Sequence, residues 1–192
     1  DQAYPPSERP NPELRVDPNN QAKLYQTHSL APDRPAVAMM AGAEYGPAKQ
    51  WPLEHFRELA KQLIERGYQV WILGGPKDVD DGNAITEGLG EFAYNLCGAT
   101  RLVDAIDLLA AAEVAVSNDS GLMHVAAAVG TKVHGIYGST SELFTPPLTD
   151  NKVIHNLHLE CSPCFKRTCP LGHTNCLKQI LPEQISASIA NQ

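Results

Sequence analysis

Residues 117–124, Ser-Asn-Asp-Ser-Gly-Leu-Met-His, decide the fold, because they join the apolar run 114–117 to a helix of small residues. A strand that turns directly into a helix leaves the first backbone N–H groups of the helix without partners, at the positive end of its dipole. Such a turn lies at the carboxyl edge of a parallel sheet, where α/β folds bind ligands. We therefore expect the amides of Ser120, Gly121 and Leu122 to hold a diphosphate.

Two features of this turn extend the predicted site. Gly121 has no side chain to keep a ligand from the backbone. His124, one turn into the helix, can donate to a phosphate or a sugar hydroxyl. The alternative is that Asp119 or Ser120 is an ordinary N-cap of a helix that binds nothing.

A second loop follows the first predicted strand, 36–41. Residues 42–52 read Gly-Ala-Glu-Tyr-Gly-Pro-Ala-Lys-Gln-Trp-Pro, which places Lys49 just before a predicted helix. Helix starts favour negative charge, so an ammonium group there is unfavourable unless an anion lies between it and the helix end. Lys49 is therefore a candidate ligand of the same diphosphate, or else a solvated surface lysine.

Outward from these loops, short apolar runs alternate with helical stretches. This alternation predicts an α/β fold, a Rossmann-like open parallel sheet with crossover helices, over residues 36–192. The further strands are expected at 68–73, 94–97, 114–117, 132–137 and 152–157, and the helices at 52–66, 78–89, 102–112, 121–129 and from 182 onward. In the helix at 102–112, Ile106, Leu109 and Ala110 are expected on the buried face.

Residues 1–35 differ from the rest of the chain in composition. They contain seven prolines, which break helices and remove backbone donors, and they have no hydrophobic periodicity. The segment is predicted to be an inter-domain linker or arm without a regular element. A disordered tail is the alternative.

Composition excludes several classes of function. The formal net charge of −7 and the pI near 5.4 argue against nucleic-acid binding, which usually needs a basic face. No apolar run reaches the ~20 residues of a spanning helix, and the chain starts without an export signal. We expect a protein that works in the cytoplasm.

The glycine patterns also narrow the choice of ligand. Neither loop reads G-x-G-x-x-G or G-x-x-x-x-G-K-[ST], so nicotinamide and flavin enzymes and P-loop nucleotidases are disfavoured. Asp78, after Gly-Gly-Pro at 74–76, is a candidate for a ribose hydroxyl, although a helix N-cap explains it equally well. Trp51 is expected in the core, with an adenine cover as the alternative.

A cysteine-rich loop, residues 158–177, holds four of the five cysteines. The pattern Cys161-x2-Cys164-x4-Cys169-x6-Cys176 offers enough thiolates for a structural tetrahedral zinc, although the spacing is not that of a common finger. Reduced thiols or a disulfide are the alternatives. Lys166 and Arg167 either face an anionic acceptor or a membrane surface, or are solvated. Cys97, in a predicted strand, is expected to be a small core residue.

Three motifs in this order resemble the type II ADP-heptose:lipopolysaccharide heptosyltransferases of glycosyltransferase family 9. They are residues 42–52, then Asn-Asp-Ser-Gly-Leu-Met-His-Val-Ala-Ala-Ala at 118–128, then Tyr-Gly-Ser-Thr at 137–140 with Phe-Thr-Pro-Pro at 144–147. The resemblance covers the chain from about Pro35 to the end and is to the C-terminal domain of that family. One departure is Ala41, where the family usually has proline.

The resemblance implies a GT-B glycosyltransferase of two facing Rossmann-like halves, of which this chain is the C-terminal, donor-binding one. Such enzymes transfer heptose with inversion from ADP-heptose to the lipopolysaccharide inner core, with no cofactor needed for the chemistry. They work at the cytoplasmic face of the inner membrane of Gram-negative bacteria. The family's acceptor site and catalytic base lie in the N-terminal half, so we expect this chain alone not to catalyse transfer.

The resemblance also assigns roles to residues of both loops. Lys49 neutralises the diphosphate leaving group, and Asp119 and His124 approach heptose or phosphate oxygens, which makes these three the catalytic candidates. The implied donor site is Gly42, Ala43, Lys49, Asp119, Ser120, Gly121, Leu122 and His124. Two alternatives stay open: a non-catalytic nucleotide-sugar-binding module, and one half of a nucleotide-sugar epimerase.

Overall fold

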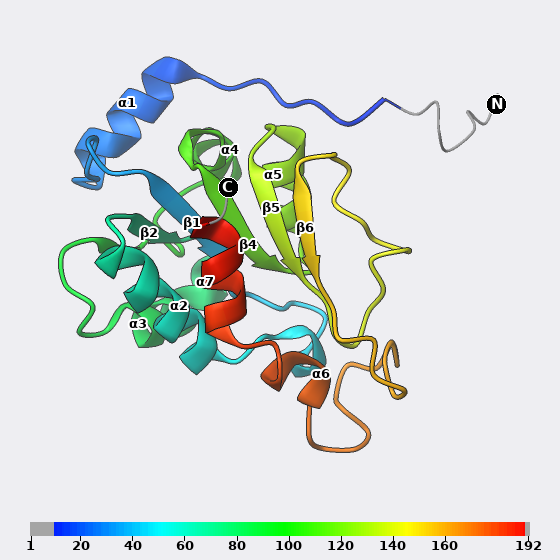
Figure 1. The fold of residues 1–192 in the computed structure, drawn as a ribbon. Coiled ribbons are helices and arrows are strands. Elements are labelled where there is room, and N and C mark those ends of the chain that lie inside the picture. The colour runs from blue at the N-terminus through cyan, green and yellow to red at the C-terminus, as the bar shows by residue number, and fades with distance from the viewer. Residues whose placement is uncertain (1–9, 191–192) are drawn as a thin grey trace.

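Six parallel strands form the centre of the fold in the computed structural model, which describes residues 10–190 (Figure 1). They are β1 (Ala36–Met40), β2 (Gln69–Ile72), β3 (Ala93–Asn95), β4 (Val114–Asn118), β5 (Lys132–Ile136) and β6 (Lys152–His155). Their order in the sheet is β3-β2-β1-β4-β5-β6. The order reverses between β1 and β4, which is where sheets of this kind open a ligand crevice. The predicted fold class, a Rossmann-like open parallel sheet, is confirmed.

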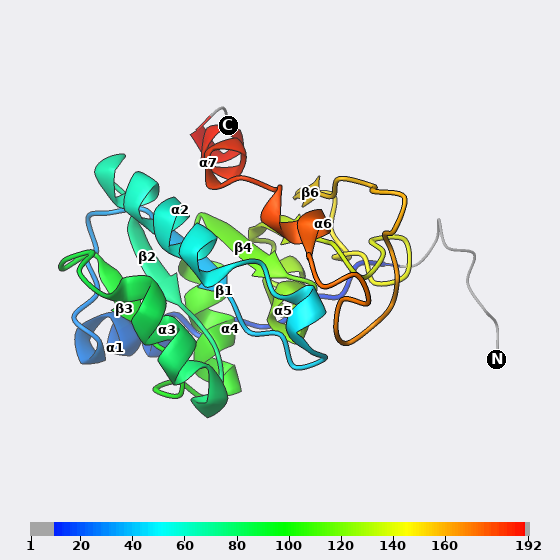
Figure 2. The ribbon, with the colours of Figure 1, turned by 90° about the horizontal axis from the view of Figure 1, so that it is seen from below.

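Helices cover both faces of the sheet, so its central strands are buried on both faces rather than exposed at every second residue. All five residues of β1 and all five of β4 are buried. The helices are α1 (Pro18–Thr27), α2 (Leu53–Glu65), α3 (Val79–Thr86), α4 (Leu102–Ala111), α5 (Gly121–Ala128), α6 (Asn175–Lys178) and α7 (Pro182–Ala190). One core cluster joins the sheet to α2, α3 and α7, and the other joins it to α1, α4 and α5 (Figure 2).

The N-terminal segment contains an element that the sequence did not predict. Helix α1 begins at Pro18, and the Asp17 side chain caps it by accepting the N–H of Asn19 at 2.9 Å. Only Leu24 is buried within the helix, so the sequence shows no hydrophobic periodicity from which the helix could be predicted. The prediction of an arm without a regular element is therefore wrong for Pro18–Thr27. A linking role between domains stays a prediction.

Helix α4 buries Leu109 as predicted, but the rest of its buried face differs from the predicted one. Ala105, Leu108 and Leu109 are buried, whereas Ile106 and Ala110 are only half-buried. The cause is α1, which packs against α4 and also covers Asp104 and Asp107.

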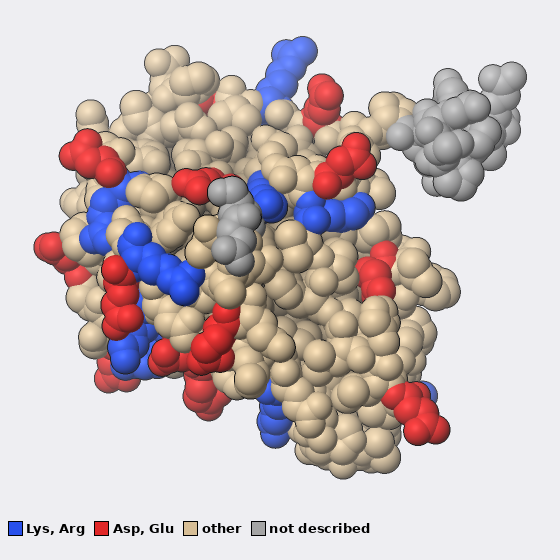
Figure 3. All heavy atoms as spheres, in the orientation of Figure 1, with Lys and Arg blue, Asp and Glu red and all other residues tan. Residues whose placement is uncertain are grey.

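The distribution of surface charge and the length of the helices are two further features of the fold. On the face drawn in Figure 3, acidic and basic side chains are interspersed rather than separated into fields of one sign. No helix among residues 10–190 combines the length and the apolar composition needed to cross a bilayer.

Candidate functional site

A cavity of about 800 Å3 opens at the carboxyl edge of the sheet, where the loops after β1, β2 and β4 meet. Eight of the predicted residues line it: Gly42, Ala43, Lys49, Asp78, Asp119, Ser120, Gly121 and Leu122. The loops come from positions far apart in the sequence, and they converge because β1 and β4 are neighbours at the point where the strand order reverses. The cavity therefore lies where α/β sheets bind ligands.

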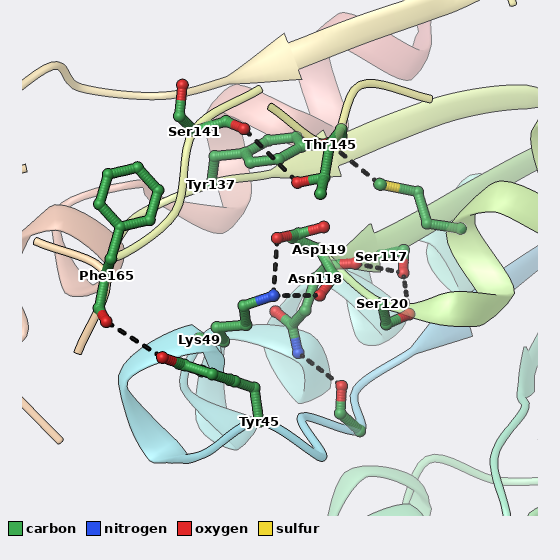
Figure 4. Close-up of polar contacts among 12 residues, drawn as sticks. Tyr45, Lys49, Ser117, Asn118, Asp119, Ser120, Tyr137, Ser141, Thr145 and Phe165 are labelled. Carbon is green, nitrogen blue, oxygen red and sulfur yellow. Dashed lines mark hydrogen bonds and ion pairs between the residues drawn. The ribbon is translucent and has the colours of Figure 1, made fainter. Parts of the chain in front are cut away.

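The two predicted loops touch through an ion pair. Nζ of Lys49 lies 2.7 Å from Oδ2 of Asp119 and 3.4 Å from the Asp119 carbonyl oxygen (Figure 4). The two side chains are 16% and 5% exposed, so water screens the pair only weakly. A single ammonium group thus sits beside the turn that opens α5.

Asn118, the last residue of β4, holds the Lys49 loop in place. Its Oδ1 accepts the N–H of Trp51 at 3.0 Å, and its Nδ2 donates to the carbonyl of Ala41 at 2.8 Å. The side chain is completely buried, so these bonds are not in competition with water. Sequence reasoning assigned Asn118 no role; a polar residue ending an otherwise apolar strand was the available signal.

Trp51 is a core residue, as expected. It is fully buried, and its indole N–H donates to the carbonyl of Ile180 at 2.9 Å. The ring packs edge-on against Phe56. The alternative in which Trp51 covers an adenine is therefore wrong, because the ring is enclosed in the core and does not line the cavity.

The first turn of α5 keeps its backbone donors available. Ser120 is the N-cap residue, but among residues 10–190 no side chain caps the helix. The Ser120 hydroxyl lies 3.1 Å from that of Ser117, and the Asp119 carboxylate pairs with Lys49. A Cβ built on Gly121 would meet nothing within 4 Å, so the backbone is open to a ligand. The ordinary N-cap alternative is not what the structure contains.

The third motif lies on the other side of Asp119. Tyr137, just after β5, is fully buried and donates its hydroxyl to the carbonyl of Thr145 at 2.6 Å (Figure 4). Burial raises the pKa of Tyr137, and the nearby charges of Asp119 and Glu142 raise it further, so the phenol stays protonated. All three motifs thus surround one point at the edge of the sheet.

Residues 4–175 match the family model for glycosyltransferase family 9 (heptosyltransferase). The chain belongs to glycosyltransferase family 9. Lipopolysaccharide heptosyltransferase 2 of Salmonella typhimurium is 39% identical over 178 residues, covering 91% of this chain and 51% of the relative. The chain spans about half the length of the curated relatives it matches.

Solved structures of heptosyltransferases are similar to this family 9 chain in fold. ADP-heptose lipopolysaccharide heptosyltransferase II of Escherichia coli superimposes with a TM-score of 0.83 at 36% identity, covering 96% of this chain and 55% of that one. Escherichia coli heptosyltransferase WaaC with ADP-2-deoxy-2-fluoro heptose gives a TM-score of 0.63 at 25% identity, over 88% and 47% of the two chains. The predicted family is confirmed.

His124 is the one residue of the predicted donor site of this family 9 chain that does not line the cavity. It is half-buried on α5. Four residues after the N-cap, it lies about 6 Å further along the helix axis than the amides that open the turn. His124 therefore does not join Lys49 and Asp119 in lining the cavity, and its role stays a prediction.

Asp78 lines the part of the cavity formed by the loop after β2. Its Oδ2 accepts the N–H of Gly75 at 2.7 Å, which caps the 3-10 turn η3 (Pro76–Asp78). The expected capping of the next helix is not formed, because Asp78 is the N-cap residue of α3 but its side chain makes no capping hydrogen bond there. The carboxylate also fills the gap between two glycines: a Cβ on Gly42 would lie 2.8 Å from it, and one on Gly74 would lie 2.7 Å from it. Asp81, which sequence reasoning missed, lies beside it and accepts from Gln50 at 2.8 Å. Asp78 thus has a structural role whether or not it also meets a ribose.

The cysteine-rich loop of this family 9 chain is not arranged as a metal centre. All five cysteines are free, and within residues 10–190 no group of three or more His, Cys, Asp or Glu side chains could hold an ion. The tetrahedral zinc arrangement of Cys161, Cys164, Cys169 and Cys176 is therefore not formed in the structure, and none of the four is in a disulfide. Backbone N–H groups, that of Thr174 first, lower the pKa of Cys169. Cys97 is buried as expected, and burial raises its pKa to about 12.

Proposed function

We propose that this chain is the donor-binding half of an inverting heptosyltransferase that moves L-glycero-D-manno-heptose from ADP-heptose to the lipopolysaccharide inner core. The observation that carries the proposal is the meeting of Lys49 with the opening turn of α5 at the wall of the cavity. A pyrophosphate fits there because it would accept from the helix amides on one side and from the ammonium on the other.

The same arrangement also stabilises the transition state of the transfer. When the bond between heptose and ADP breaks, negative charge grows on the departing diphosphate. Donors that are already oriented stabilise that charge without rearranging, which is the strongest kind of electrostatic contribution to a transition state. Asp119 holds Lys49 at 2.7 Å and so keeps the ammonium directed at the turn. Lys49 and Asp119 are the catalytic residues of this proposal, with His124 a third contact to heptose or phosphate oxygens once the donor is bound.

The shape of the cavity orients the donor. From the α5 turn it extends past Gly42 and Ala43 toward Gly74, Asp78 and Asp81. With the diphosphate at the turn, the nucleoside lies toward these acidic side chains and the heptose lies on the opposite side, near Asp119. The WaaC structure with a fluorinated ADP-heptose supports a donor of this class for a similar fold.

The remaining parts of the reaction belong to a second half. Because relatives are about twice as long, we propose that the acceptor site and the general base lie in an N-terminal domain that faces this cavity. This chain alone then binds donor without transferring heptose. Acting on a lipopolysaccharide precursor places the enzyme at the cytoplasmic face of the inner membrane, with Lys166 and Arg167 exposed for contact with anionic groups.

Calorimetry with ADP tests the proposal. We expect wild-type chain to bind ADP, and Lys49→Ala to weaken binding by about tenfold to a hundredfold, the value of a hydrogen bond to a charged group. Lys61→Ala, an exposed lysine on α2, is the matched control and should bind like wild type. Folded wild-type protein that binds no ADP would remove the proposal. Equal affinity for UDP would favour the epimerase alternative.

A further inference from the structure

Lys49 lies on an irregular stretch, so something other than a helix or strand must fix its position. Between β1 and α2 the only regular element is the 3-10 turn η2 (Pro47–Lys49). After Lys49 the loop is tied to β4 by Asn118 and to the core by Trp51. Before Lys49, the loop is held by a different part of the chain: residues 162–167 of the cysteine-rich loop.

Two hydrogen bonds join that segment to the Lys49 loop. The N–H of Ala48 donates to the carbonyl of Arg167 at 3.1 Å, and the Tyr45 hydroxyl donates to the carbonyl of Phe165 at 3.0 Å (Figure 4). Ala48 is 2% exposed, so its amide has no water to replace the Arg167 carbonyl. The residue adjoining Lys49 is thus fixed by the cysteine-rich loop.

Gly46 allows the two segments to approach this closely. Its φ of +149° lies in a region that L side chains rarely adopt, and a Cβ there would lie 2.6 Å from the Arg167 carbonyl oxygen. Glycine is therefore required at this position both by backbone conformation and by the contact.

The same segment is anchored at its other end to β5. The N–H of Phe165 donates to the carbonyl of Ser139 at 2.7 Å, and the Ser162 hydroxyl donates to the carbonyl of Gly138. Residues 162–167 thus connect the end of β5 to the loop that follows β1. One end of this connection reaches the loop that carries Lys49, and the other reaches the residues that follow β5.

The ring of Tyr45 adds an electrostatic link. Nζ of Lys49 and the guanidinium carbon of Arg167 each lie 5.2 Å from the centroid of this ring. Cations at such distances are attracted to an aromatic face. Tyr45 therefore contacts the segment through its hydroxyl and Lys49 through its ring.

We propose that residues 162–167 form a brace that positions Lys49 for the diphosphate, acting through Tyr45 and Ala48. Tyr45, Phe165 and Arg167 are positioning residues. Phe165 and Arg167 accept hydrogen bonds from the Lys49 loop through their backbone carbonyls, and the Arg167 guanidinium also lies over the Tyr45 ring. The identity of the ligand of Lys49 rests on the proposed function. The contacts by which the brace holds Lys49 do not depend on that function. The cysteine-rich loop then positions Lys49 through contacts that involve none of its cysteines.

A double-mutant cycle tests the brace. Tyr45→Phe removes the hydroxyl and keeps the ring, and we expect it to weaken ADP binding by about threefold to tenfold in calorimetry, the value of one hydrogen bond. In a Lys49→Ala background the same change should have no further effect, because no ammonium is left to position. Equal losses in both backgrounds, or no loss in either, would overturn the proposal.

A second measurement needs no ligand. Gly46→Ala should push the loop off the brace and accelerate hydrogen exchange of the Ala48 amide at least tenfold. Gly90→Ala is the matched control, because Gly90 also has a positive φ, of +86°, but a Cβ there would meet nothing within 4 Å. Unchanged exchange at Ala48 in Gly46→Ala, or in Tyr45→Phe if the first variant does not fold, would contradict the brace. Absence of ADP binding by wild type, with accelerated exchange, would remove the proposed function alone.

Discussion

Nζ of Lys49 and Oδ2 of Asp119 lie 2.7 Å apart across a separation of 70 positions in the sequence. Both side chains are largely removed from water, so each charge depends on the other for compensation. The pair therefore has a structural role in addition to its proposed role in binding diphosphate.

Removing the lysine should destabilise the fold through the carboxylate left behind. We expect Lys49→Ala to lower the free energy of unfolding by about 1–3 kcal/mol, the cost of a buried charged group without its partner. The double variant with Asp119→Asn should recover part of this loss, because the uncompensated charge is gone. Urea unfolding measures both. A double variant that loses the sum of the two single losses would show that the charges are not coupled.

The buried pair of His134 and His155 makes stability depend on pH. Nδ1 of His134 lies 3.0 Å from Nε2 of His155, and the rings stack with centroids 5.2 Å apart. Burial, together with the nearby charges of His155 and Lys132, lowers the pKa of His134 to about 3, and burial lowers the pKa of His155 to about 4. Both values lie below the 6.5 of an unfolded chain, so the unfolded state takes up protons first.

The resulting stabilisation is complete above pH 6.5 and is lost as the pH falls toward 4. Each histidine should account for about 2 kcal/mol of the loss between pH 7 and pH 5. We expect His155→Gln to flatten the pH dependence of urea unfolding over that range. His28→Gln, at the end of α1, is the single-histidine control. It should not change the slope of unfolding free energy against pH, because the buried pair is intact. A slope unchanged in His155→Gln would contradict the assignment.

The role of Asp78 can be assigned by comparing the binding of ADP with that of inorganic pyrophosphate. Asp78→Asn keeps an oxygen for the Gly75 N–H but removes the charge that would attract ribose hydroxyl donors. We expect it to weaken ADP binding by about threefold to tenfold and to leave inorganic pyrophosphate binding unchanged. Asp80→Asn, exposed on α3, should affect neither. Equal affinity of wild type and Asp78→Asn for ADP would reduce Asp78 to its capping role.

Much of the fold was predictable because its strands are short apolar runs bounded by glycine, proline and polar residues. The strands at 36–41 and 114–117, for example, are β1 and β4 to within one residue. The helix α1 was not predictable in this way, because one buried leucine gives no period and its stability comes from packing on α4. The four-residue helix α6 was also missed, since it is too short to show a pattern.

The site was predictable where it depends on local chemistry and unpredictable where it depends on distant contacts. The turn at 118–121 and Lys49 stand out because a strand, a glycine and a helix start follow one another in sequence. The bond from Tyr45 to Phe165 spans 120 positions and is made to a backbone carbonyl, so no residue type marks it. His124 was placed by helical spacing alone, which gives its height on α5 but not whether the cavity reaches it.

Helix α1 should be held to the domain by a small buried polar cluster. Nδ2 of Asn20 donates to Oδ1 of Asp104 at 3.0 Å and to Oδ2 of Asp107 at 2.7 Å. Asp107 is 4% exposed, and its other carboxylate oxygen accepts the N–H of Asp17, so its partners come from the start of α1.

Because Asp107 would be left partly unsatisfied, we expect Asn20→Ala to cost about 1–3 kcal/mol in urea unfolding and to accelerate hydrogen exchange throughout Pro18–Thr27. Gln26→Ala, exposed on the same helix, should change the free energy of unfolding by no more than about 0.5 kcal/mol. The same variant should leave the hydrogen-exchange rates of the helix nearly unchanged. If Asn20→Ala behaves like Gln26→Ala, apolar contacts of Leu24 rather than the cluster hold the helix, and Leu24→Ala should then release it.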